Sequence, residues 1–212
     1  MVRKRRLYDR SGTAEGRREA RVPVRVVIAE DEWLIAAALR QELEDRGYEV
    51  LAVAGTGEAA VEAVASIRPD VVVMDIGMPG MDGLEATRLV MDRCPACVIV
   101  VTGRWGQADA AVQAGAMDCV GKPLTGAAID RVVERARGRF RRYGFVQAEA
   151  GGHGQAMATW LAVRCAMAVL AARGARSEEA AFEGMRRLAA EGGMSLREAA
   201  ERVLSESAAE PA

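Results

Sequence analysis

The hydrophobic pattern of residues 23–146 alternates between two kinds of stretch. Short runs of Val, Ile, Leu and Ala without charged interruption are typical of strands that are buried on both faces of a sheet. Longer stretches with apolar residues three or four positions apart are typical of amphipathic helices. The predicted strands are residues 24–29, 48–54, 71–74, 98–101 and 117–120, and the predicted helices are residues 33–44, 57–67, 84–91, 107–114 and 129–142.

This alternation predicts an α/β fold, with a five-stranded, doubly wound parallel sheet of the flavodoxin-like kind and helices on both faces. Polar residues follow the predicted strands in a regular way. Glu30 and Asp31 follow the first strand, and Asp75, Thr102 and Lys122 each stand at the carboxyl end of another. Because these ends meet at one edge of a parallel sheet, we expect the five side chains to converge in space.

The converging side chains define a chemistry. Three carboxylates in one place repel one another unless a cation joins them. Oxygen ligands with few protein contacts suit Mg²⁺, which keeps part of its water shell and accepts a phosphoryl oxygen, while Lys122 and Thr102 can bind the other phosphoryl oxygens. The pattern predicts phosphoryl transfer onto Asp75 as nucleophile. The simpler alternative is that Asp75 only caps the next helix.

Four short motifs surround these residues. They are V-I-A-E-D at 27–31, M-D-I-G-M-P-G-M-D-G at 74–83, V-T-G at 101–103 and G-K-P at 121–123. Each motif alone is weak, but in this order and spacing they are specific, and residues 23–146 resemble the receiver domain of two-component response regulators. The resemblance implies that a histidine kinase phosphorylates Asp75.

The same resemblance implies roles for the neighbouring residues. The implied ligands of Mg²⁺ are the carboxylates of Asp31 and Asp75, the backbone carbonyl of Gly77 and, through a bound water, Glu30. Thr102 and Lys122 would hold the phosphoryl group. The peptide bond between Lys122 and Pro123 would be cis, as X-Pro bonds occasionally are.

One position departs from the family pattern. Receivers usually carry Tyr or Phe three residues before the lysine, and this ring moves inward when the threonine reorients. The present chain has Cys119 there, so the usual switch between Thr102 and an aromatic ring cannot operate unchanged. Receivers also dimerise through a helix–strand–helix face, here residues 104–138, and we expect a homodimer on phosphorylation.

Residues 147–212 form a separate region in the pattern. Six arginines between residues 131 and 142 precede it, and they indicate either a solvated helix face or a contact with a phosphate backbone. The Gly-Gly-His-Gly segment at 151–154 indicates a flexible break. Three further helices follow, at 157–172, from the predicted N-cap Ser177 to about 190, and from the Ser195–Glu198 capping box onward. We therefore divide the chain into a basic tail at 1–22, a receiver domain at 23–146 and a three-helix domain at 147–212.

These three helices carry a second resemblance. The stretches L-A-A-R at 170–173, S-E-E-A-A-F-E-G-M-R-R-L-A at 177–189 and L-R-E-A-A at 196–200 resemble the ANTAR domain, the RNA-binding output module of antitermination regulators. The resemblance implies a dimer that binds tandem RNA hairpins in a nascent transcript and prevents a terminator from forming. The candidate RNA-binding residues are Arg164, Arg173, Arg186 and Arg187.

Two features of the region depart from the ANTAR pattern. Ala-Met-Ala at 166–168 replaces the usual Ala-Lys-Gly, so a characteristic lysine is missing. From residue 155 to 212, seven arginines stand against eight glutamates, whereas an RNA binder usually shows a basic footprint. The main alternative is therefore a phosphorylation-regulated protein-interaction or dimerisation module that has lost RNA binding.

Two other functions fit the sequence less well. A helix-turn-helix that binds DNA would need a better recognition helix than the last one, which offers only Arg197 and Arg202 among several glutamates. An independent enzyme would need a nucleophile, a base and an orienting group outside the receiver, and the only His of the chain is His153. We therefore expect no separate catalytic domain.

Composition narrows the picture further. Residues 1–25 hold nine Lys or Arg against three acids, and no apolar core follows them, so we expect a solvated tail and no signal peptide. No stretch of the sequence approaches the ~20 apolar residues that a membrane span requires, and we therefore expect a soluble cytoplasmic protein. Cys-Pro-Ala-Cys at 94–97 matches a redox or metal pair, but it has no second pair and we interpret it as coincidence.

Overall fold

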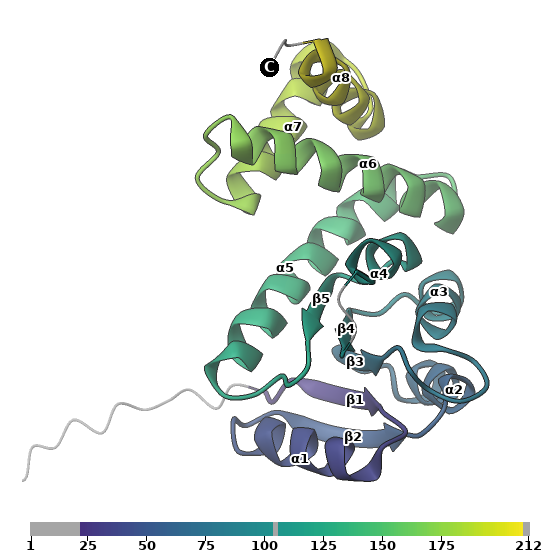
Figure 1. Cartoon of the computed structure of the whole chain (residues 1–212). Coiled ribbons are helices and arrows are strands. Elements are labelled where there is room, and N and C mark those ends of the chain that lie inside the picture. The colour runs from purple at the N-terminus through teal and green to yellow at the C-terminus, as the bar shows by residue number, and fades with distance from the viewer. Residues whose placement is uncertain (1–21, 104–105, 210–212) are drawn as a thin grey trace, which may run out of the picture.

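The five predicted strands form one parallel sheet in the order β2-β1-β3-β4-β5 (Figure 1). The computed structural model describes residues 22–103 and 106–209, so the predicted tail lies outside the described residues except for Val22. The strands are β1 (Arg25–Ala29), β2 (Glu49–Ala54), β3 (Val71–Asp75), β4 (Val98–Thr102) and β5 (Asp118–Gly121). The predicted doubly wound α/β fold is confirmed.

Helices connect the strands and continue beyond the sheet. Those of the sheet region are α1 (Trp33–Glu44), α2 (Gly57–Ile67), α3 (Gly83–Arg93), α4 (Ala108–Ala114) and α5 (Ala127–Glu149). The C-terminal helices are α6 (His153–Ala172), α7 (Glu178–Gly192) and α8 (Leu196–Ala209). Ser177 caps α7 by accepting a hydrogen bond from Ala180 N at 3.1 Å, and Ser195 and Glu198 form the predicted capping box.

The central strands β3 and β4 are buried on both faces, and they are apolar at every position except the last. Side chains alternate between the faces of a strand, so Val71 and Val73 pack on the side of α1 and α5, whereas Val72 and Met74 pack on the side of α2 and α3. Continuous valine runs are therefore needed in the central strands. This double coverage leaves the ends of the strands as the place for polar side chains.

Helix α5 is longer than predicted and joins the two parts of the molecule. It begins beside β5 and runs without interruption to Glu149, so it crosses the predicted domain boundary at residues 146 and 147. Figure 1 shows it extending from the sheet to the C-terminal helices. Its last turns bury Tyr143 and Val146, and the ring of Tyr143 meets Trp160 of α6 edge-on, with 6.2 Å between the ring centroids.

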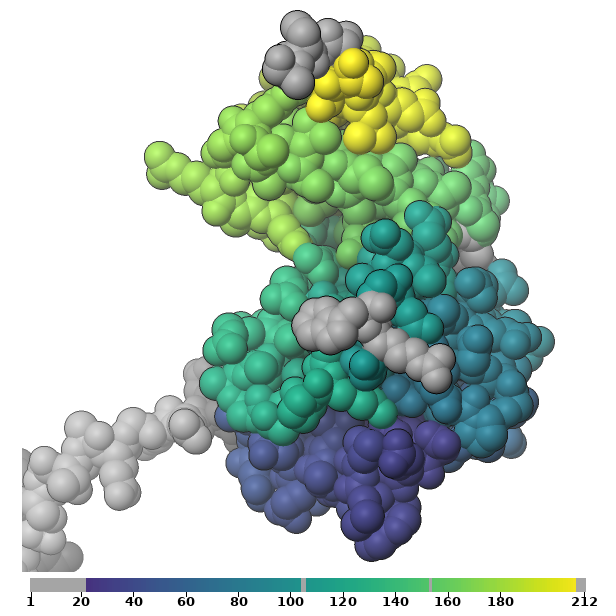
Figure 2. Space-filling view, in the orientation of Figure 1, coloured from purple at the N-terminus to yellow at the C-terminus, as the bar shows by residue number. Residues whose placement is uncertain are grey.

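The C-terminal helices share one continuous hydrophobic core with the α5 side of the sheet. Trp160, Phe182 and Met185 are fully buried in it. Gly115, at φ +102°, lies so close to α6 that an added Cβ would stand 2.8 Å from Met157 Cε. Figure 2 shows the C-terminal helices, green to yellow, packed against one end of the sheet-containing part.

Helix α6 requires a correction to the sequence analysis. Its segment Gly154–Ala172 is long and apolar enough to cross a membrane by length and composition, although the sequence pattern suggested no such stretch. About a third of the segment is buried within the protein, where α6 packs against α3, α5, α7 and α8. The same apolar character is what a core helix shared by four neighbours requires.

Candidate functional site

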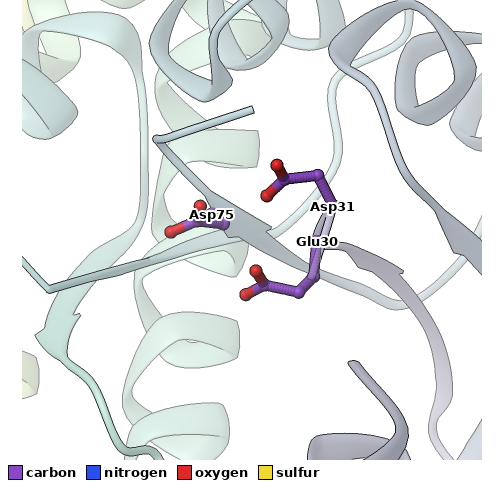
Figure 3. Close-up of side chains that lie close together, drawn as sticks. All are labelled: Glu30, Asp31 and Asp75. Carbon is purple, nitrogen blue, oxygen red and sulfur yellow. The ribbon is translucent and has the colours of Figure 1, made fainter. Parts of the chain in front are cut away.

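Three carboxylates meet at the carboxyl edge of the sheet, as predicted. Glu30 and Asp31 follow β1, Asp75 ends the adjacent β3, and one carboxylate oxygen of each lies within 4.8 Å of the others. Glu30 and Asp75 are buried, whereas Asp31 is exposed to solvent. Figure 3 shows the three side chains directed toward a common space.

Lys122 supplies the positive charge of this cluster. Its Nζ lies 2.6 Å from Glu30 Oε2 and 3.0 Å from Asp75 Oδ1. Burial acts to lower the pKa of Lys122, but the hydrogen bonds and charges of the two carboxylates outweigh it and raise this pKa, so the ammonium stays protonated. Burial raises the pKa of Glu30; the Lys122 hydrogen bond opposes this shift and repulsion by Asp75 adds to it.

The turn after β3 fixes the orientation of the Asp75 carboxylate. The backbone N–H of Gly77 donates to Asp75 Oδ2 at 2.9 Å, while Lys122 contacts the other oxygen. Gly83, the first residue of α3, approaches the strand so closely that an added Cβ would stand 1.9 Å from the carbonyl oxygen of Asp75. Only glycine fits at this position, because any larger residue would displace the strand end that carries the acceptor.

Thr102 and Lys122 complete the site from the neighbouring strands. The backbone N–H of Lys122 donates to the carbonyl oxygen of Thr102 at 2.9 Å, so the ends of β4 and β5 are joined. The Thr102 hydroxyl donates to Gln107 Oε1 at 3.1 Å, and Gln107 is the N-cap residue of α4. The peptide bond between Lys122 and Pro123 is cis, as the family resemblance implied.

Cys119 lies on β5, which β4 separates from the strand of Asp75. It is half-buried, pairs in register with Val100 and packs on the side of the sheet covered by α2, α3 and α4. Burial raises the pKa of its thiol, and the nearby charge of Asp118 adds to the shift. The thiol is therefore neutral at physiological pH, and what it does in a switch stays a prediction.

The cluster could hold a metal ion. Three carboxylates against the one ammonium of Lys122 leave two net negative charges (three minus one), and a divalent cation neutralises that charge. Asp31 is exposed, so an ion can enter from solvent and keep its waters. The donor set therefore fits a hard divalent cation.

A cavity of about 580 Å³ adjoins the cluster. Glu30, Asp75 and Lys122 line one end of it, and the rest is largely apolar, between α1 and the loop from β5 to α5. At the start of α1, Trp33 and Leu34 are 74% and 66% exposed. The carboxylate cluster therefore stands beside an accessible apolar surface, which the sequence did not indicate because α1 shows ordinary helical spacing.

The basic residues of α5 divide into two groups: Arg131 and Arg141 are exposed on the helix surface, whereas Arg139 and Arg142 form ion pairs within the protein. Arg139 Nη1 donates to Asp118 Oδ1 at 3.0 Å, and its Nε donates to Glu178 Oε1 at 3.0 Å. Arg142, itself buried, pairs with Glu178 at 2.6 Å and with Glu179 at 2.8 Å. We call Asp118, Arg139, Arg142, Glu178 and Glu179 the α5–α7 ion network. It ties β5 and α5 to the start of α7.

The four arginines predicted to bind RNA do not form one surface. Arg164 turns inward, where its Nη1 donates to the carbonyl oxygen of Ala116 at 2.9 Å, and burial lowers its pKa. Arg186 and Arg187 are exposed on α7 and line a shallow hollow with Glu183. Arg173 stands at the end of α6. The sequence analysis missed Phe145, which is 54% exposed on α5 and lies under Arg186.

The two cysteines of the C-x-x-C motif face opposite sides of the sheet. Cys94 belongs to the core on the α2 and α3 side, whereas Cys97 belongs to the core on the α5 side. Both are free and buried, and burial raises the pKa of the Cys97 thiol to about 12. This arrangement agrees with the interpretation of the motif as coincidence.

Comparisons with known proteins match both parts of the chain. The family model of the response regulator receiver domain matches residues 26–134. The transcriptional regulatory protein PdtaR of Mycobacterium tuberculosis (strain ATCC 25618 / H37Rv) is 34% identical over 189 residues, which are 88% of this chain and 92% of that protein. A protein-glutamate methylesterase/protein-glutamine glutaminase of Cupriavidus pinatubonensis is 44% identical, but the match spans 47% of this chain and only 31% of that protein.

Solved structures match the sheet-containing part. The signal receiver domain of a modulated diguanylate cyclase from Desulfovibrio desulfuricans is 31% identical with a TM-score of 0.53, over 57% of this chain and 98% of that one. A two-component response regulator of the LuxR family from Aurantimonas is 30% identical with a TM-score of 0.51, over 55% of this chain and 86% of that one. The similarity to a transcriptional regulator covers 88% of the chain, and the family model covers residues 26–134. Together with the geometry of the carboxylate cluster, these matches show that the chain belongs to the response regulators and carries their receiver domain.

Proposed function

We propose that this protein accepts a phosphoryl group on Asp75 from a histidine kinase and then acts through its C-terminal helices as an RNA-binding transcription antiterminator. One observation carries the proposal: the acceptor cluster of Asp75, Lys122 and Thr102 stands in a chain that resembles a transcriptional regulatory protein over 88% of its length. The proposed place of action is the cytoplasm, where nascent transcripts are found.

The cluster suits in-line transfer to a carboxylate. An oxygen of Asp75 forms the new bond to phosphorus while the bond between phosphorus and the kinase histidine breaks, and the histidine nitrogen leaves with the electron pair. Lys122 already contacts Asp75 Oδ1. After the transfer, its ammonium can donate a hydrogen bond to a negatively charged phosphoryl oxygen. Thr102 can donate its hydroxyl there after it leaves Gln107.

The metal proposed for the site is Mg²⁺. Asp31, Asp75 and the backbone carbonyl of Gly77 would hold it, and Glu30 would act through a bound water. Bound there, Mg²⁺ would supply positive charge beside the phosphoryl oxygens. The orientation of the Asp75 carboxylate comes from the chain itself, because Lys122 and the N–H of Gly77 already contact its two oxygens.

The output would be the binding of paired RNA hairpins, favoured by dimerisation after phosphorylation. Three of the candidate arginines, Arg173, Arg186 and Arg187, remain at the ends or surface of the C-terminal helices. The position of Arg164 inside the protein favours the alternative function, a regulated protein-interaction module, because it removes one cation from the RNA surface. The two proposals differ in a measurable way, since only the first requires affinity for RNA.

A titration of labelled paired-hairpin RNA, followed by fluorescence anisotropy, tests the proposal. It is run with Mg²⁺, with and without beryllofluoride as a mimic of the phosphoryl group, and with Asp75→Asn as the control that cannot accept the mimic. We expect binding that tightens with beryllofluoride in the wild type and not in the variant. Equal RNA binding with and without beryllofluoride would mean that the receiver does not control RNA binding. Absence of RNA binding would favour the protein-interaction alternative.

Phosphorylation has its own test. Incubation with a labelled small phosphodonor should place label on the wild type and none on Asp75→Asn, while circular dichroism shows that the variant is folded. Label that persists on Asp75→Asn would overturn the assignment of the acceptor.

A further inference from the structure

We propose that the seam between α5 and α7 holds a binding site for one unpaired base of an RNA loop, built from Phe145, Arg186 and Arg187. The inference rests on the proposed RNA-binding function and names where and how the RNA is read. Phe145 comes from the last turns of α5, while the two arginines come from α7. The site thus spans the helix of the receiver and a helix of the output region.

The ring of Phe145 is placed so that an unpaired base can stack on it as on a platform. Phe145 is 54% exposed, whereas Phe182, the aromatic residue that it contacts, is buried. Its ring is tilted against Phe182, with 6.3 Å between the centroids, so the inner side of the ring is supported by the core. A supported and exposed aromatic ring is the feature on which unpaired bases stack.

Arg186 extends this platform. Its guanidinium carbon lies 5.4 Å from the centroid of the Phe145 ring, and Glu183 holds Nη1 of the same guanidinium at 2.9 Å. The guanidinium is therefore fixed from two sides while its side chain remains 46% exposed. A flat cation held over an aromatic ring offers its outer surface to a base, because bases stack on guanidinium planes as well as on rings.

Arg187 provides the contact for the phosphate. It is exposed next to Arg186 on the shallow hollow, and its guanidinium has no ion-pair partner in the part of the chain that the structure describes. Arg141 stands one turn before Phe145 on α5 and is also exposed. An unpaired guanidinium beside a stacking platform is the arrangement that recognises a nucleotide rather than an apolar peptide.

The local charges set a limit on the strength of the site. Glu183 neutralises part of Arg186, and Glu149 is exposed one turn after Phe145. The site therefore suits one nucleotide with few phosphate contacts and not a long duplex. This explains how a region with near-neutral composition can bind RNA: stacking supplies affinity that does not depend on net charge.

The experiment uses the full chain and paired-hairpin RNA in which one loop purine at a time is replaced by 2-aminopurine. Stacking quenches 2-aminopurine, so the wild type should quench at one loop position. Phe145→Leu should weaken binding by roughly 10-fold and abolish that quenching, and Phe145→Trp should restore both. Arg187→Gln should weaken binding and reduce the slope of log K against log salt by about 0.7.

The matched control is Arg197→Gln, which removes an arginine of α8 that pairs with Glu201 at 2.8 Å. It changes the net charge equally and should leave binding and quenching unchanged. Thermal unfolding checks that each variant is folded; if Phe145→Leu is not, Arg187→Gln and the loop position of the quenching still decide the question. RNA binding that is unchanged in the folded variants among Phe145→Leu and Arg187→Gln overturns this site and leaves the proposed function standing. A wild type that binds no RNA overturns both.

Discussion

At the scale of single residues, a substitution of Asp31 tests whether the acidic cluster binds a metal ion. Asp31 is exposed, whereas Glu30 and Asp75 are buried beside Lys122. We expect Mg²⁺ at about 100 times its dissociation constant to stabilise the wild type by about 2.7 kcal/mol, which is roughly 5–10 °C in melting temperature. Asp31→Asn should lose this shift. Differential scanning fluorimetry with and without Mg²⁺ measures it.

The neighbouring Glu32 provides the control for this prediction. It is exposed like Asp31 but stands outside the three-carboxylate cluster, so Glu32→Gln should keep the full Mg²⁺ shift. A shift that survives in Asp31→Asn and disappears in Glu32→Gln would place the metal elsewhere. Ca²⁺ should give a smaller shift than Mg²⁺, because two protein carboxylates and one carbonyl suit an ion that keeps several waters.

A second prediction at the residue scale concerns the contribution of Tyr143 to stability. The ring of Tyr143 packs in the core between α5 and α6, but its hydroxyl oxygen is buried without a hydrogen-bond partner among residues 22–103 and 106–209. Burial also raises the pKa of this hydroxyl. A buried polar group without a partner destabilises a fold by about 1–3 kcal/mol. Tyr143→Phe should therefore be neutral or stabilising by up to about 1 kcal/mol; a loss of stability in urea unfolding would reveal a partner, such as an ordered water.

At the scale of elements, the α5–α7 ion network links three segments that lie far apart in the sequence. Glu178 at the start of α7 accepts from both Arg139 and Arg142 of α5, and Arg139 also contacts Asp118 of β5. Arg142 is buried, so loss of the Glu178 carboxylate would leave its charge compensated only by the exposed Glu179. We therefore expect Glu178→Gln to lower stability by about 1–2 kcal/mol, below the value for a fully buried pair because Glu178 is partly exposed.

The network also predicts a dependence on pH. Burial acts to raise the pKa of Glu178, but its hydrogen bond with Arg139 and the charges of Arg139, Arg142 and Arg164 outweigh it and lower this pKa. The carboxylate then contributes stability above the ordinary glutamate pKa of about 4.3, and this contribution is lost as pH falls through the lowered folded value. Urea unfolding from pH 6 to pH 3 should show that Glu178→Gln removes part of the acid sensitivity. Glu179→Gln, at a 67% exposed position, should change it less.

The elements themselves were largely predictable, whereas the contacts between distant elements were not. The valine run that ends in Asp75 and the short stretch Cys-Val-Gly before Lys122 carry strand and site information in the local sequence, because the ends of parallel strands must share one edge. The pairing of Arg139 with Glu178 leaves no local signature, since it depends on how α7 is placed. Phe145 was equally hidden, because it adjoins the buried Val146 in the same helix and only packing decides which of the two is exposed.

At the scale of the whole molecule, the acceptor site and the output helices are connected through β5. Lys122 directly follows this strand, while Asp118 at its start belongs to the α5–α7 ion network. The core is also continuous from the sheet to α6, α7 and α8. We therefore expect a shift of β5 to reach α7 through the contacts of Arg139 with Asp118 and Glu178, without an aromatic ring at position 119.

This connection predicts changes in hydrogen exchange at α4 and α7. If Lys122 and Thr102 turn to a phosphoryl group on Asp75, we expect Thr102 to leave Gln107 at the start of α4 and β5 to shift beside Asp118. Beryllofluoride with Mg²⁺ should then change hydrogen exchange in two places, the first turn of α4 and the start of α7 around Glu178, and Asp75→Asn should show neither change. In Glu178→Gln the change at α4 should persist while that at α7 weakens, because the ion network carries the second step. Equal changes at α7 with and without Glu178 would assign the coupling to the shared hydrophobic core instead.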